Sequence, residues 1–538
     1  MRFRRPVRTK SPDDVFHTRS DLSLSMSSAR ESWREHKVLL LTAVAISIAL
    51  SLWRIGFSDV INNDGVMYLS AANRITQGDW HSFLDYISLP VFPGMIAGVH
   101  QLFGVSLETS AKMINTVFFA GVVVLFVLLV GELGGDRRTL AWGAAVILFF
   151  SQINDYRAFI IRDTPYWFFV LLGLLLYMKY YRTPSWPLAL GWALSFVAAM
   201  MYRFEGVFYL ALMPLAGLLQ KQIPVKARLQ ATLKAYSVPI AGVLVLLLMG
   251  LGHQGGAGPF VRVGNIISGI TNAIPNMVQA FSQHSKAVEP FLLHSDIDKY
   301  TGVALVAALL AAWTAKLVNT LTLPYAALAV YAWYTRMRWK RAAEWRVVVW
   351  ALGIGVALSL GVLFTQFLAN TRHMIPMALM ILLAVPFVLS HIQQNWWERR
   401  QTRLGRDWQR LAALGAVAIV FLSGVHGFGR EKTYIAEAGR WLKPKLNGES
   451  VVYSTDNKVL YYAGWFDRHA WRPAPTWAQI KQAVEEGKEA DYYIIYLRRK
   501  HAKSGRESRE LLGEPVKVFA NRDDDKVIIF SGRRGGTG

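Results

Sequence analysis

The sequence predicts an α-helical polytopic membrane protein with about 11 transmembrane helices and a small C-terminal α/β domain. Three observations predict this fold class. Hydrophobic residues make up 53% and aromatic residues 13% of the 538 positions, which is too apolar for an ordinary soluble protein of this size. The apolar residues gather in long runs. After residue 429 the composition changes to a mixed polar pattern.

The predicted spans follow from the length of these runs, because a helix needs about 20 mostly apolar residues to cross the hydrocarbon core. Some runs are short, and the eighth is long enough to contain a break near Lys316 or Pro324. The predicted spans are 38–55, 110–133, 139–153, 163–181, 186–202, 205–220, 235–252, 302–334, 347–368, 373–391 and 410–428.

The basic residues indicate an orientation, because Lys and Arg next to spans stay on the cytoplasmic side. If every run crosses once, alternate connections contain most of these residues, including Lys179, Arg182 and Arg341. The opposite side then contains the long loops 56–109 and 253–301. We therefore expect a multi-pass membrane protein with a cytoplasmic N-terminus and an extracytoplasmic C-terminal domain. One span more or fewer would reverse the side of that domain.

The ends of the chain differ from the spans between them. Residues 1–36 are basic and Ser-rich without a cleavage pattern, which predicts a disordered cytoplasmic tail before a transmembrane domain over residues 37–429. Acidic residues in this tail argue against a mitochondrial transit peptide. Residues 430–538 are predicted to form the small α/β domain, with strands near 451–454, 491–497 and 526–530 and helices near 433–442 and 476–487.

Charge and cysteine content exclude several classes of function. The formal net charge of +23 does not predict nucleic-acid binding, because the basic residues lie in short bursts between apolar runs. The chain has 0 cysteines, which excludes disulfides, thiolate metal sites and cysteine nucleophiles.

Ionisable residues gather at the predicted outer ends of the spans. They are Asp64 after the first span, Arg162 and Asp163 in the second outer connection, Arg203 and Glu205 in the third, and Arg372 and His373 in the fifth. Ionisable groups at membrane depth are costly to bury, so they are functional candidates by default.

Each of these residues also has a structural explanation. Asp64 could cap a helix that starts at Gly65, and Asp163 precedes Thr164-Pro165, which is typical of a helix start. The arginines could pair with neighbours, extend to the interface or contact lipid headgroups. Their common membrane face favours a shared site, because unrelated structural roles would not require it.

This mixture of side chains suits transfer of a group from a phosphate leaving group to a hydroxyl or amine at the outer membrane surface. A carboxylate can act as general base for the acceptor proton. Arginine side chains can stabilise the phosphate as negative charge develops on it.

The ordered set of motifs resembles the multi-spanning GT-C glycosyltransferases. Within these it is most similar to bacterial relatives of the protein O-mannosyltransferases (glycosyltransferase family 39) and to the aminoarabinose transferase of lipid A. The resemblance covers roughly residues 38–500. It rests on Asp64 with Tyr68 and Ala71-Ala72-Asn73-Arg74, Leu89-Pro90-Val91-Phe92-Pro93-Gly94, Arg162-Asp163, Arg203-Phe204-Glu205-Gly206, Arg372-His373-Met374-Ile375-Pro376 and Lys458-Val459-Leu460-Tyr461-Tyr462-Ala463-Gly464.

The resemblance implies an inverting hexosyl- or pentosyltransferase. It would move a sugar from a polyprenyl-phosphate donor to a lipid, glycan or protein acceptor at the outer face of the bacterial cytoplasmic (inner) membrane. Asp64 would be the catalytic base or substrate-orienting acid, Asp163 the second catalytic acid, and Arg203 and Arg372 the contacts of the lipid phosphate. The implied substrate-binding set is completed by Tyr68, Arg162, Glu205 and His373.

One position departs from the resemblance. Many relatives have an Asp-Glu pair in the first loop, whereas Gly65 follows Asp64 in this chain. Asp163 or Glu205 is then left as the second acid. No metal ligand set is predicted, because neither a dense carboxylate cluster nor a His pair at ligand spacing is present. A divalent cation shared by Asp64 and Asp163 stays open as an alternative.

A polytopic transporter or a flippase for lipid-linked sugars is the alternative function. Transporters commonly have their polar site near the middle of the membrane, whereas here the polar residues are predicted at one surface. The loop 253–301 is interpreted either as a lid over the site or as a simple surface loop.

Overall fold

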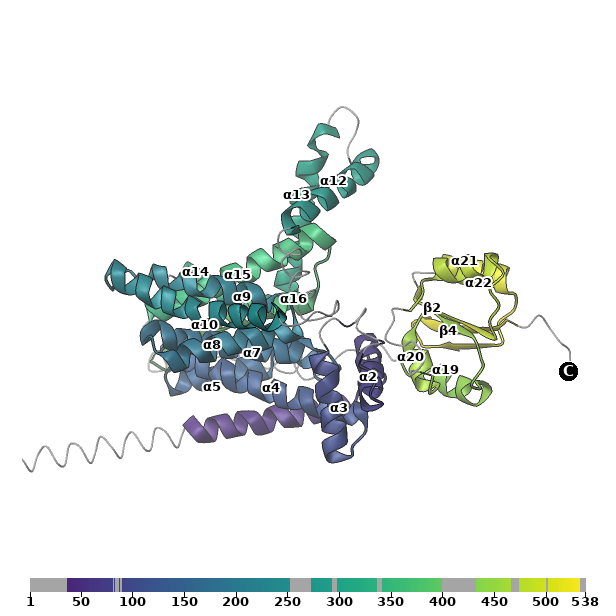
Figure 1. The fold of residues 1–538 in the computed structure, drawn as a ribbon, viewed down its shortest axis with the longest axis horizontal. Coiled ribbons are helices and arrows are strands. Elements are labelled where there is room, and N and C mark those ends of the chain that lie inside the picture. Colours follow the sequence, from purple (N-terminus) through teal and green to yellow (C-terminus); the bar gives the residue numbers. More distant parts are fainter. Residues whose placement is uncertain are drawn as a thin grey trace, which may run out of the picture.

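The computed structural model describes residues 36–251 apart from 81, 83–86 and 88–89, and residues 272–292, 298–335, 341–398, 432–465, 474–499 and 502–532. Residues 36–398 form a helical bundle, and residues 432–532 form a separate α/β unit beyond one end of it (Figure 1). We refer to the latter as the C-terminal unit. The predicted N-terminal tail and the predicted span 410–428 lie outside the described residues.

The bundle starts with the helix His36–Gly56. Its further helices, in chain order, are α2 (Asn63–Thr76), α3 (Val91–Phe103), α4 (Leu107–Glu132), α5 (Arg137–Leu148), α6 (Ser151–Asp155), α7 (Asp163–Arg182), α8 (Trp186–Tyr202), α9 (Gly206–Leu212), the 3-10 helix η1 (Met213–Leu219), α10 (Val225–Leu251), α12 (Ala273–Leu292), η2 (Asp298–Tyr300), α13 (Thr301–Leu321), α14 (Leu323–Tyr334), α15 (Ala342–Gln366), α16 (Thr371–Leu382) and α17 (Val385–Glu398).

The chain is a multi-pass membrane protein, although the predicted number of about 11 spans is not confirmed. Five helices of the described part are long and apolar enough to cross a membrane, namely His36–Gly56, Leu107–Glu132, Thr301–Leu321, Ala342–Gln366 and Thr371–Asn395. Shorter apolar helices accompany them, among them Trp186–Tyr202 and Gly206–Leu219. The predicted break in the eighth run separates α13 from α14 at Thr322, where φ is +65° and Pro324 follows in the first turn.

Residues predicted for opposite membrane faces lie at opposite ends of α7. At its C-terminal end, Arg182 pairs with Glu132 at 2.9 Å and with Glu344 at 3.0 Å. Arg341, predicted on the same face, is 3.4 Å from Glu132. Asp163 is at the other end, and a helix of 20 residues is about 30 Å long. The bundle therefore separates the two predicted sets by about the thickness of a bilayer core.

The C-terminal unit is a sheet with helices on both faces. Its strands β1 (Val452–Ser454), β2 (Tyr492–Leu497), β3 (Lys517–Ala520) and β4 (Lys526–Ser531) have the order β1-β2-β4-β3, in which only the β1–β2 pairing is parallel. The helices α19 (Thr433–Leu442) and α20 (Asn457–Tyr462) cover one face, and α21 (Trp477–Glu485) and α22 (Ala502–Leu512) cover the other (Figure 1).

The strands expected near 451–454, 491–497 and 526–530 correspond to β1, β2 and β4. The helices expected near 433–442 and 476–487 correspond to α19 and α21. The short edge strand β3 was not predicted, because its residues are mostly exposed and lack the pattern of a half-buried strand.

Candidate active site

The predicted site residues come from four places in the chain and meet at one end of the bundle. Asp64 is the second residue of α2, Asp163 opens α7, Arg203 and Glu205 lie between α8 and α9, and Arg372 and His373 are in the first turn of α16. A cavity of about 790 Å³ is lined by all of them. Tyr68 and Arg162 also line this cavity, as does Met277 of α12, which was not predicted.

Asp64 forms an ion pair with Arg372, which is 308 residues away in the chain. It is not the cap of α2, because the helix begins at Asn63 and its N-cap residue is Asn62. The Asp64 side chain remains 36% exposed toward the cavity. A carboxylate that is held by a guanidinium and still accessible can accept a proton from a bound substrate.

Asp163 lies between two arginines. Its Oδ1 accepts a hydrogen bond from Nη1 of Arg203 at 2.5 Å, and its Oδ2 is 3.6 Å from Nη1 of Arg372. The Asp163 side chain is only 3% exposed. Removing either arginine would leave a buried carboxylate without a partner, which is costly. Its geometry favours a role in holding the arginines over direct contact with a substrate.

Arg203 is fully engaged by its neighbours. Besides Asp163, its Nη2 donates to Glu205 at 2.6 Å and to the ring of His373 at 3.1 Å. Its guanidinium lies over the buried ring of Tyr166, with 5.8 Å between Cζ and the ring centroid. Burial raises the pKa of Glu205, but the contacts with Arg203 outweigh this effect, so that the pKa lies below its usual value. Glu205 is therefore a carboxylate at neutral pH.

Arg162 differs from the other arginines of the cavity, because it forms no ion pair with a carboxylate in the described part of the chain. Tyr68 lines the cavity with it and packs edge-on against Phe92 at 5.1 Å. Burial raises the pKa of Tyr68, so its hydroxyl stays protonated. The cavity thus contains an unpaired cation and a neutral hydroxyl donor.

The position between Asp64 and Asp163 does not suit a metal ion. Nη1 of Arg372 is within ion-pair distance of oxygens of both carboxylates, where a shared hard cation would have to lie. The described residues include no group of three or more His, Asp or Glu side chains that could hold a metal. The donor set therefore disagrees with the alternative of a divalent cation shared by the two aspartates.

The structure explains why Gly65 follows Asp64. A Cβ atom at position 65 would lie 2.9 Å from Oδ1 of Asn62, 3.0 Å from Cγ1 of Ile61 and 3.1 Å from Cβ of Ile160. The Asn62 side chain is fixed there, because it donates to the Ile160 carbonyl at 3.0 Å and accepts from the Ile160 N–H at 2.8 Å. A glutamate next to Asp64 would not fit this arrangement.

Other polar residues of the second outer connection point away from the cavity. Arg157 is fully buried and donates to the Ser47 carbonyl at 2.9 Å and to the Ser51 hydroxyl at 2.8 Å. Asp155 pairs with Arg54 at 3.0 Å. Both contacts attach this connection to the first helix. Sequence alone could not separate these residues from Arg162 and Asp163, which come a few positions later.

The helical bundle shares its fold with solved GT-C oligosaccharyltransferases. This confirms the fold that the sequence motifs suggested. No protein-family model matches the sequence, and no curated protein matches it significantly. The likeness therefore rests on solved structures.

The archaeal oligosaccharyltransferase AglB from Archaeoglobus fulgidus, solved with an inhibitory peptide and a dolichol-phosphate, has a TM-score of 0.56 and 12% identity, with coverage of 95% of this chain and 75% of AglB. An Archaeoglobus fulgidus oligosaccharyltransferase tethered to an acceptor peptide has a TM-score of 0.52 and 14% identity, with coverage of 93% and 74%. ArnT from Cupriavidus metallidurans, bound to undecaprenyl phosphate, has a TM-score of 0.40 and 12% identity, with coverage of 93% and 98%. The fold likeness rests on the first two.

Proposed function

We propose that the chain is an inverting glycosyltransferase that moves a sugar from a polyprenyl-phosphate donor to a lipid, glycan or protein acceptor at the outer membrane surface. The observation that carries the proposal is the cavity that contains both the accessible carboxylate of Asp64 and the guanidinium of Arg162, which has no carboxylate partner among the described residues. The likeness to AglB, which was solved with a dolichol-phosphate and a peptide, supports it.

Asp64 is the general base of the proposed reaction. The acceptor oxygen or nitrogen attacks the anomeric carbon from the face opposite the phosphate, and the bond between that carbon and the phosphate oxygen breaks. The acceptor proton passes to the Asp64 carboxylate, and the polyprenyl phosphate leaves with the bonding electrons. Arg372 forms an ion pair with Asp64 and orients its carboxylate before the transfer. Attack from the opposite face inverts the anomeric configuration.

The arginines of the cavity have different proposed roles. We assign the first contact with the donor phosphate to Arg162, because Arg203 is already neutralised by Asp163 and Glu205. This differs from the role that the family resemblance implies for Arg203. Asp163 is proposed as a positioning residue that holds Arg203 and Arg372, rather than as a second catalytic acid. A fixed pair of charges needs little reorganisation when the leaving group develops charge.

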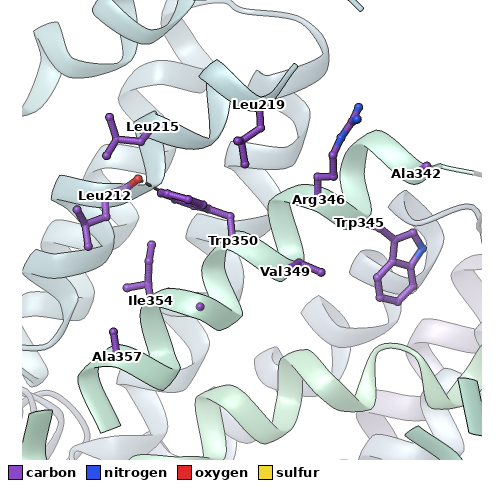
Figure 2. Close-up of a pocket in the computed structure, with 11 residues that line it drawn as sticks. Leu212, Leu215, Leu219, Ala342, Trp345, Arg346, Val349, Trp350, Ile354 and Ala357 are labelled. Atoms are coloured by element: carbon purple, nitrogen blue, oxygen red, sulfur yellow. Dashed lines mark hydrogen bonds between the residues drawn. The ribbon is translucent and has the colours of Figure 1, made fainter. Parts of the chain in front are cut away.

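The polyprenyl chain of the donor is proposed to lie in an apolar groove that continues from the cavity. The groove has a volume of about 690 Å³ and shares Leu212, Ile354 and Ala357 with the cavity wall. Figure 2 shows leucines of α9 and η1 on one side and residues of α15, including Trp350, on the other. The indole N–H of Trp350 donates to the Leu212 carbonyl at 2.9 Å, so this donor is satisfied within the groove wall. Burial of each methylene in such a groove contributes about 0.8 kcal/mol.

The transporter or flippase alternative is less well supported by this geometry. The charged residues lie at the ends of α7, α8 and α16 rather than in the middle of these helices. A carboxylate at a helix end beside an apolar groove suits chemistry on a lipid headgroup. A turnover assay separates the two functions, because a flippase moves the lipid-linked sugar without breaking its phosphate bond.

The test is an assay of the purified protein with candidate polyprenyl phosphosugars, read by mass-resolved detection of the transferred sugar. Asp64→Asn should abolish transfer while the protein remains folded. The matched control is Asp155→Asn, because Asp155 is also paired with an arginine but does not line the cavity. A normally expressed Asp64→Asn variant with wild-type turnover would refute the assignment.

A further inference from the structure

The C-terminal unit is attached to the segment that leads into α2 (Figure 1). The Ile61 N–H donates to the hydroxyl oxygen of Tyr462 at 2.9 Å, and the Lys432 N–H donates to Oδ2 of Asp59 at 3.2 Å. Between these contacts, Val60 packs against the hydrophobic core of the C-terminal unit. Three consecutive residues before Asn62 are therefore held by a part of the chain about 400 positions away.

Tyr462 is itself held in a fixed place. It is the last residue of α20, and α20 crosses α19 so closely that a Cβ on Gly439 would lie 2.5 Å from the Tyr462 Cβ. The preceding residue makes a second attachment, because the Tyr461 hydroxyl donates to Oε2 of Glu108 at 2.6 Å. Glu108 lies in the first turn of α4. The packing of α20 against α19 and the hydrogen bond to Glu108 therefore fix the position of the Tyr462 hydroxyl next to Ile61.

Asn62 extends this contact to the second loop of the site. Its amide makes two hydrogen bonds to the backbone of Ile160, which precedes Arg162 and Asp163. It makes no side-chain cap of α2, although it is the N-cap residue. The segment 59–62 is therefore fixed by the C-terminal unit on one side and by the loop of Arg162 on the other. Asp64 follows within the first turn of α2.

We propose that Tyr462 and Asn62 are positioning residues for the transfer, and that the C-terminal unit sets the place of Asp64 relative to Arg372 and Arg162. The proposal rests on the transferase function proposed above. Ile61 precedes α2, so its N–H has no partner within a helix, and Tyr462 supplies the acceptor that fixes it. A shift of about 1 Å in a catalytic group can lower the rate about 100-fold. The C-terminal unit is then part of the catalytic apparatus although none of its described residues lines the cavity.

The test uses Tyr462→Phe in the full-length protein, which removes a hydroxyl and leaves the ring. We expect kcat for transfer to fall about 10-fold or more. The donor KM should change less than about 2-fold, because Arg162 and the apolar groove are untouched. The amide of Ile61 should exchange hydrogen faster in a peptide that covers residues 57–63. The matched control is Tyr453→Phe in β1, whose hydroxyl makes no hydrogen bond within the described residues and which should keep the wild-type kcat.

A second variant keeps the inference testable if Tyr462→Phe disturbs the fold. Asn62→Asp keeps the shape and the N-cap preference but places an oxygen against the Ile160 carbonyl. It should also lower kcat more than it raises the donor KM. An unchanged kcat in both variants, with wild-type turnover present, would overturn the inference and leave the transferase proposal intact. A wild-type protein that transfers no sugar would overturn the transferase proposal, and unchanged exchange at Ile61 in Tyr462→Phe would separately overturn the proposed attachment.

Discussion

Arg162 offers the sharpest test of how the cavity recognises a phosphate. It lines the cavity without a carboxylate partner in the described part of the chain, so its donors are free for a ligand. Arg162→Gln removes the charge and keeps a polar side chain of similar reach. A hydrogen bond to a charged group contributes about 1.5–3 kcal/mol. The expected loss of affinity for a polyprenyl phosphate is therefore about 10- to 150-fold.

The assay measures binding of an undecaprenyl phosphate without a sugar to the purified protein, which isolates recognition of the leaving group. Arg162→Lys should retain part of the affinity, because lysine keeps the charge without the planar fork. Thermal stability should stay near wild type in both variants, because no carboxylate loses its partner. Wild-type affinity in Arg162→Gln would refute the assignment.

Arg203→Gln is the contrasting variant. Arg203 is 11% exposed and holds the buried Asp163 and the neighbouring Glu205. Breaking a buried ion pair by removing one partner costs about 3–5 kcal/mol. This variant should therefore lower the thermal stability strongly, whereas Arg162→Gln should not. Equal stability of the two variants would contradict the division between a structural and a substrate-facing arginine.

Three further predictions follow from the cavity and the groove. Gly353→Phe should raise the KM of long-chain donors more than that of short-chain ones. A Cβ at Gly353 meets open space in the groove, so the phenylalanine ring would occupy part of the proposed lipid path. Equal effects on both donors would contradict that path. The lowered pKa of Glu205 predicts a pH-dependent difference in stability between wild type and Glu205→Gln. The difference should be constant above about pH 5 and should shrink as the pH falls through the lowered pKa of Glu205. Thermal unfolding at several pH values checks this. Turnover should persist after chelation of divalent cations, because Arg372 lies between Asp64 and Asp163, and a loss in chelator that Mg²⁺ or Mn²⁺ restores would contradict it.

The sequence predicted the gathering of the site residues through topology. Once Arg182 and Arg341 are placed on one face, Asp163 is on the other, because a 20-residue helix separates it from Arg182. Asp64 lies on the same face as Asp163, because it follows the outer end of the first predicted span. This reasoning needs only span lengths and basic residues, and it brought the predicted residues to one cavity.

The pairings inside the cavity could not be predicted. Asp64 and Arg372 are 308 positions apart, and nothing in the sequence says that Arg372 contacts Asp163 while Arg162 pairs with no carboxylate that the structure describes. Orientation within a connection is equally hidden, because the turns between α6 and α7 follow no regular period that would predict the direction of a side chain. Arg157 and Arg162 lie in the same connection, yet the first anchors a helix and the second lines the cavity.

The crowding around Gly65 has a consequence for how such sequences can vary. A side chain at position 65 collides with Asn62 and Ile160, so a glutamate there requires the first and second loops to change together. A single substitution at position 62 would break the bridge to the Ile160 backbone, and a single substitution at position 65 would strain the backbone beside Asp64. A related sequence with a second acid directly after this aspartate should therefore differ from this chain by at least two coupled substitutions. In a set of related sequences, a residue other than glycine at position 65 should therefore occur together with a change at position 62.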